Sequence, residues 1–133
     1  MSEQPGIADV AALNAAQADW KGLGTAAASG QLRLEPGVAE QCAVACEKAR
    51  SQLILRKQDV QGIGRLRGFG DLRSGQELQR KFETKATGGP GSAEEVLQQH
   101  MDLLVDMAAT YRAAGTAFAQ RDHSTADALR AQS

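Results

Sequence analysis

The chain has 133 residues, a net charge of −1 and 42% hydrophobic residues, which is enough material for one small domain. It has no apolar run of about 18 residues, so the sequence predicts no membrane span. Alanine accounts for 24 residues, whereas only five side chains are aromatic. Because helices built from such small side chains bury little apolar area, we expect a partner subunit to cover part of the surface.

The first 31 residues predict a weakly ordered N-terminal segment. Apolar residues from Ile7 to Trp20 have a loose helical spacing, and three glycines between positions 22 and 30 interrupt the helix that they form. We expect a short helix followed by a mobile linker. A basic start followed by an apolar stretch, the mark of a cleaved signal peptide, is absent here, so we expect synthesis in the cytoplasm.

A first long helix is predicted over residues 37–67. Pro36 fits the first helical turn, and the residue before a proline avoids helical backbone. Repeated glycines near position 64 weaken the helix and end it. Apolar side chains recur along it at steps of three and four residues. The positions expected to form a partner-binding seam on this helix are Val38, Ala45, Leu53 and Val60.

Two cysteines, Cys42 and Cys46, lie one helical turn apart beside this apolar stripe. Buried free thiols are favoured over a disulfide or a metal pair. A zinc site needs about four ligands, and His100 and His123 are the only histidines that could complete one. The sequence therefore predicts no metal site and no cofactor.

The middle of the chain predicts a turn followed by a short helix. Phe69-Gly70-Asp71-Leu72 has the composition of a turn, and Ser74 with Glu77 forms a capping-box pattern. The glycine-rich run 88–91 ends this element after about two to three turns.

A second long helix is predicted over residues 93–122, where Ser92 and Glu95 form another capping-box pattern. Its apolar positions alternate at steps of three and four residues, as in a helix packed lengthwise on another helix. His123-Ser124-Thr125 interrupts this rhythm, so residues 123–133 are expected to form a flexible tail. The positions expected to form the seam on this helix are Leu97, His100, Leu104, Met107 and Tyr111.

Together these elements predict an all-α protein. Two rods of roughly 45 Å, at about 1.5 Å per residue, would form an antiparallel helical hairpin over residues 32–122, with the short helix in the connection. The exposed side of such a hairpin is expected to pair with a second one, which gives a four-helix bundle.

Charge is unevenly distributed along the chain. Residues 1–47 carry a net charge of −4, residues 48–87 carry +6 and residues 88–133 carry −3. Charge complementarity within the chain or with a partner protein is favoured, and the alternative is a cytoplasmic nucleic-acid-associated or regulatory helical protein. That alternative would use Arg56, Lys57, Arg65, Arg67, Arg73, Arg80, Lys81 and Lys85.

Catalytic constellations are hard to assemble from this sequence. Both histidines lie on one predicted helix and its tail, and the glycines do not follow the order of a phosphate-binding loop. We therefore expect no catalytic residues and no enzymatic activity.

The segment Leu32-Arg33-Leu34-Glu35-Pro36, the Ala-rich helix after it, the Gly-containing bend and the second amphipathic helix resemble the Esx-like (WxG-type) helical-hairpin proteins of actinobacterial type VII secretion, particularly their excreted-factor relatives. The resemblance covers roughly residues 32–122. It implies a substrate of that system or a targeting partner of a larger substrate. Such proteins pair with themselves, with another helical-hairpin protein or with the helical N-terminal region of a substrate, and they are secreted without a cleaved signal.

The resemblance also implies an export signal. The family carries Tyr-x-x-x-Asp/Glu after the second helix, and Phe118 and Asp122 stand at this spacing with Phe in place of Tyr. Trp20-Lys21-Gly22 spells a Trp-x-Gly motif, but it precedes both long helices, whereas the family places this motif in the bend. Phe118 and Asp122 are therefore the residues expected to contact the secretion apparatus.

Overall fold

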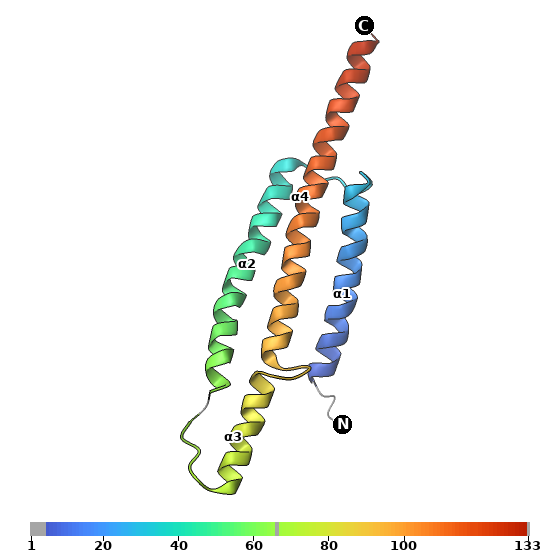
Figure 1. Ribbon diagram of the computed structural model, residues 1–133. Coiled ribbons are helices and arrows are strands. Elements are labelled where there is room, and N and C mark those ends of the chain that lie inside the picture. Colours follow the sequence, from blue (N-terminus) through green and yellow to red (C-terminus); the bar gives the residue numbers. More distant parts are fainter. Residues whose placement is uncertain (1–4, 66, 133) are drawn as a thin grey trace. The chain divides into compact units, whose positions relative to one another are not determined.

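The computed structural model describes residues 5–65 and 67–132, and this part of the chain is helical without any strand. The all-α class is therefore confirmed. Leu66, within the predicted first long helix, lies outside the described residues, as do residues 1–4 of the predicted N-terminal segment and residue 133 of the predicted tail. The helices are α1 (Pro5–Ala28), α2 (Pro36–Ile63), α3 (Arg73–Ala86) and α4 (Ala93–Ala131), labelled in Figure 1.

Helix α1 is longer than the short helix predicted from the sequence: it has 24 residues and continues through Gly22 and Gly24. Trp20 explains part of this difference, because its ring packs edge-on against Tyr111 with the centroids 5.3 Å apart. Tertiary packing of this kind overrides weak helix propensity. The helix ends at Ala28, and Gly30, with a φ of 81°, provides the left-handed residue of the Schellman-type cap that follows.

Helix α2 begins as predicted, with Pro36 in its first turn. The carboxylate of Glu35 accepts hydrogen bonds from the backbone N–H groups of Gly37 and Val38, both at 3.0 Å. These bonds cap the helix and lower the pKa of Glu35. The helix ends at Ile63, four residues before the predicted end, where the glycine-rich sequence begins.

The two predicted capping boxes have different outcomes. Ser92 caps α4, because its Oγ accepts the N–H of Glu95 at 3.2 Å while the Glu95 carboxylate accepts the N–H of Gly91 at 2.8 Å. The prediction for Ser74 is wrong: α3 begins at Arg73, and Ser74 lies inside the first turn. The cap position is Leu72, which has no side-chain acceptor to offer.

The end of α4 is also later than predicted, at Ala131 instead of residue 122. His123, Ser124 and Thr125 are tolerated because they have moderate helix propensity and none of them is a proline or glycine. Backbone geometry alone therefore does not require the helix to stop at this point.

The described chain divides into two compact units. Unit 1 contains the residues up to Asn14 together with Arg50–Asp102, and unit 2 contains Ala15–Ala49 together with the chain from Leu103 onward. Helices α1, α2 and α4 each contribute to both units.

Unit 2 is built around small side chains. Ala43, Cys46 and Ala108 form its buried cluster, against which larger, partly buried side chains from α4 pack. Those larger residues are Leu104, Met107 and Tyr111. The contact between α2 and α4 in this unit therefore depends on backbones that approach closely.

In unit 1, α3 lies beyond the ends of α2 and α4 (Figure 1). The loop in front of it folds back, so that the ring of Phe69 packs against Phe82 with the centroids 6.2 Å apart. Gly75 permits this approach, since a Cβ there would collide with the carbonyl oxygen of Phe69. Among the described residues of α3 only Ala86 is buried.

Candidate interaction surfaces

Of the four α2 residues in the predicted seam, two are exposed and two are half-buried. Val38 is 48% exposed and Ala45 is also exposed, whereas Leu53 and Val60 are half-buried. The buried face of α2 in unit 2 is formed by residues next to the predicted ones, at Ala39, Ala43 and Cys46. Val38 and Ala45 are thus open to a partner.

The α4 positions of the predicted seam are mostly half-buried. Leu104, Met107 and Tyr111 pack against the cluster of unit 2, and Leu97 is also half-buried. His100 is exposed, and its Nδ1 lies 2.8 Å from the carbonyl oxygen of Val96, to which it donates. This bond ties the imidazole to its own helix.

Arg112 connects α4 to α2 in unit 2 through four hydrogen bonds. Its guanidinium donates to both carboxylate oxygens of Glu40 at 3.1 and 3.2 Å, and to both of Glu47 at 2.8 and 3.1 Å. These bonds raise the pKa of Arg112 and lower that of Glu47. The sequence carried one clue to this cluster: Glu40 and Glu47 are seven residues apart and therefore share a helical face.

Both cysteines are free thiols in the structure. Cys46 is buried in unit 2 and Cys42 is half-buried. Burial raises the pKa of the Cys46 thiol, and nearby Cys42 and Glu47 raise it further. Burial likewise raises the pKa of Tyr111, which lies close to the two thiols. Within the described ranges, no three His, Cys, Asp or Glu side chains are grouped so that they could hold a metal ion.

The candidate export signal lies where α4 loses its neighbours. Phe118 is half-buried, whereas Asp122, one turn later, is exposed. From Gln120 to Gln132 every residue except Ala126 is exposed, and this final stretch of α4 extends past α1 and α2 of unit 2 (Figure 1). The carboxylate of Asp122 is thus accessible to a second protein.

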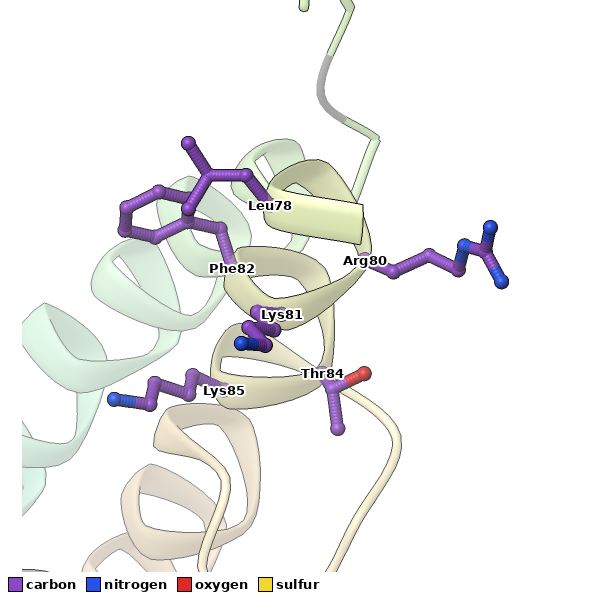
Figure 2. A pocket seen from close by; sticks show the side chains of 6 residues that line it. All are labelled: Leu78, Arg80, Lys81, Phe82, Thr84 and Lys85. Atoms are coloured by element: carbon purple, nitrogen blue, oxygen red, sulfur yellow. The ribbon is translucent and has the colours of Figure 1, made fainter. Parts of the chain in front are cut away.

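A second accessible surface lies on α3. Leu78 and Phe82, 47% and 48% exposed, project together from one side of the helix, and Arg80 points away from them (Figure 2). The residues that line the shallow hollow around them include three cations, one hydroxyl and no acid: Leu78, Arg80, Lys81, Phe82, Thr84 and Lys85. This arrangement combines an apolar contact with positive charge.

The basic segment 48–87 is partly neutralised by its own surroundings. Arg56 pairs with Asp59 at 3.1 Å, and Arg73 pairs with Glu77 at 3.4 Å. Lys57 donates to the side-chain carbonyl of Gln98 at 2.6 Å. Three of the eight cations of the nucleic-acid alternative are therefore engaged inside unit 1.

Comparison of the chain with protein-family models, with curated proteins and with solved structures gives no match. In the part of the chain that the structure describes, none of the helices has the length and apolar character needed to cross a membrane.

Proposed function

We propose that this chain is a non-enzymatic interaction protein of type VII secretion, either a substrate or a targeting partner of a larger substrate. In this proposal the long helices act as an antiparallel helical hairpin, which pairs with a second copy or with another helical-hairpin protein into a four-helix bundle. A third partner in this proposal is the helical N-terminal region of a substrate, which would bind the hairpin in the same way. Secretion then proceeds without a cleaved signal.

One observation supports pairing more than any other. The buried side chains of the described residues are mostly alanines, and no large side chain among them is fully buried. Large apolar side chains remain exposed instead, among them Val38 and Leu55 of α2 and Val105 of α4. A partner that covers them would provide apolar burial at about 25 cal/mol per Å², which the single chain lacks.

Sedimentation of the purified protein over a wide concentration range tests the pairing. We expect a dimer, or a complex with a helical partner, and Val38→Asp should weaken it. Asp at this position lies in the first turn of α2, where the helix dipole favours a carboxylate, so the variant should keep its helicity. A monomer at every concentration, with no helical partner captured, would contradict the pairing.

The proposed contact with the secretion apparatus needs a separate test, because it uses Phe118 and Asp122 and not the seam. An aromatic anchor and a carboxylate four residues apart lie on one helical face and offer an apolar and a charged contact together. Asp122→Ala is the cleaner variant, since Asp122 is exposed whereas Phe118 is half-buried. In cells with a type VII system, Asp122→Ala should abolish export, and Asp127→Ala, on the same exposed stretch, is the matched control. Export of Asp122→Ala at the wild-type level would contradict the proposal that Phe118 and Asp122 form an export signal.

The nucleic-acid alternative has less support. Of its eight cations, Arg56 and Arg73 are already paired with carboxylates, and Arg80 projects to the opposite side of α3 from Leu78 and Phe82. A nucleic-acid surface requires cations that converge on one face with few acids between them.

A further inference from the structure

We propose that α3 is a membrane-docking helix that binds the surface of a bilayer containing anionic phospholipids. This inference goes beyond the proposed function, because it uses none of the seam residues and neither Phe118 nor Asp122. It depends on three features of unit 1: the composition of one side of α3, the position of α3 at the end of the unit, and the short length of its apolar contact.

One side of α3 combines apolar and basic side chains. Leu78 and Phe82 project together, and Lys81 and Lys85 flank them on the same helix (Figure 2). At 100° per residue, Lys85 lies about 20° and Lys81 about 60° from Leu78 around the helix axis, whereas Arg80 lies about 160° away. Apolar side chains that enter the acyl boundary while lysines reach phosphate groups are typical of interfacial helices.

The acids of α3 form no ion pair with these lysines. Glu77 pairs with Arg73, and the carboxylate of Glu83 accepts a hydrogen bond from Gln79. Residues 64–87 contain six cations and three acids, so the surroundings of the helix are also positive. An anionic surface attracts such a segment in proportion to the number of basic side chains that reach it.

The position of α3 suits a flat partner. The helix lies beyond the ends of α2 and α4 in unit 1 (Figure 1). Its exposed residues include Leu78, Lys81 and Lys85. Leu72, directly before the helix, is also exposed, at 76%. This side of α3 is therefore accessible to a partner.

The length of the apolar contact distinguishes a bilayer from a partner helix. Leu78 and Phe82 are four residues apart, so the exposed apolar contact is one helical turn long. A helical partner needs apolar positions repeated over several heptads to form a seam. An interfacial helix needs only a few anchors because electrostatic attraction supplies the remaining affinity.

Vesicle flotation tests this proposal. The full-length protein is mixed with vesicles of phosphatidylcholine alone or of phosphatidylcholine with phosphatidylglycerol, at about 50 and about 150 mM salt. We expect flotation with the phosphatidylglycerol vesicles only, and weaker flotation at the higher salt. The double variant Lys81→Glu/Lys85→Glu should bind at least about tenfold more weakly. The control Arg33→Glu/Arg121→Glu, which reverses the same number of charges at exposed positions outside α3, should remain within about threefold of wild type.

A neutral variant separates insertion from charge attraction. Leu78→Gln keeps every charge and replaces an exposed side chain, so its helicity by circular dichroism should match wild type, while its affinity for phosphatidylglycerol vesicles should fall severalfold. Equal losses for the two double variants would show that the affinity follows the overall charge of the protein and would overturn the proposal. So would equal flotation with both kinds of vesicle. If the protein ignores anionic vesicles but binds an acidic amphipathic peptide, the occupant is a protein and the proposal fails.

Discussion

Gly115 of α4 lies directly against Ala39 of α2. A Cβ at position 115 would stand 2.8 Å from the Cβ of Ala39 and 3.6 Å from the Cα of Pro36. Since real Cβ atoms do not approach each other so closely, the two helices of unit 2 can be this near only while residue 115 is glycine. Position 115 therefore has to be glycine, although alanine has the higher intrinsic helix propensity.

Gly115→Ala should therefore destabilise the protein, although alanine is the better helix former by about 1 kcal/mol. We expect a net loss of about 1–3 kcal/mol in the free energy of unfolding, because α2 and α4 must move apart. Gly22→Ala is the control: no heavy atom lies within 4 Å of a Cβ there, so stability should rise by up to about 1 kcal/mol. Urea unfolding followed by circular dichroism measures both, and a Gly115→Ala protein as stable as wild type would contradict this packing.

Leu104 and Val105 are adjacent but face different surroundings. Leu104 packs against the cluster of unit 2, whereas Val105 is 49% exposed. Leu104→Asp should cost about 3 kcal/mol, because it leaves a carboxylate without a partner beside apolar side chains. Val105→Asp should change the stability of the monomer by no more than about 0.5 kcal/mol. Thermal unfolding, measured at a protein concentration too low for dimerisation, compares the stability of the two variants. Equal melting temperatures would mean that the cluster is wrongly placed.

Stability should fall as the solution becomes acidic. Hydrogen bonds from Arg112 lower the pKa of Glu47, and backbone N–H groups at the start of α2 lower the pKa of Glu35. A carboxyl whose pKa is lower in the folded state stabilises the protein above its unfolded pKa of about 4.3, and this contribution is lost as the pH falls through the folded value.

Melting temperatures measured between about pH 7 and about pH 3 check this expectation. The curve of Glu47→Gln should be flatter than that of wild type, and Arg112→Ala should lower the melting temperature at neutral pH. Arg121→Ala, an exposed arginine on the same helix, serves as the control and should leave the curve unchanged. If Glu47→Gln follows the wild-type curve, the bonds to Arg112 do not contribute to stability in solution.

The two cysteines should differ in reactivity. The thiolate is the reacting species, and the pKa of the buried Cys46 thiol is raised. Cys42 is more accessible, so iodoacetamide at about pH 8 should modify it first and Cys46 only as the protein opens. Peptide mapping by mass spectrometry resolves the two rates, which should become similar in urea. Faster modification of Cys46 in the native protein would contradict its burial.

The sequence predicted local features well where a few neighbouring residues decide them. Pro36 and Ser92 mark helix starts because the cap geometry depends on side chains within one turn. The end of α4 and the length of α1 could not be predicted in this way. Trp20 meets Tyr111 from a distant part of the chain, and no local pattern reveals that contact.

The candidate surfaces could likewise be predicted only where residues close in sequence determine them. Apolar spacing indicated which helices are amphipathic, but it could not tell Ala39 from its neighbour Val38 as the buried residue, because the backbone distance at Gly115 decides this. The bonds from Arg112 to Glu40 and Glu47 likewise join residues more than 60 positions apart. Leu78, Lys81 and Lys85 lie on one side of α3. Because they are close in sequence, helical geometry alone could have predicted this arrangement.

The last stretch of α4, from Gln120 onward, is helical while almost all of its side chains are exposed. Its helix–coil equilibrium is therefore set by intrinsic propensity and local ion pairs such as Arg130 with Asp127, and is largely independent of global unfolding. Such a segment frays gradually on heating, so ellipticity at 222 nm should decline with temperature well before the cooperative transition. Its amide hydrogens should exchange through local opening, ahead of those in the rest of α4.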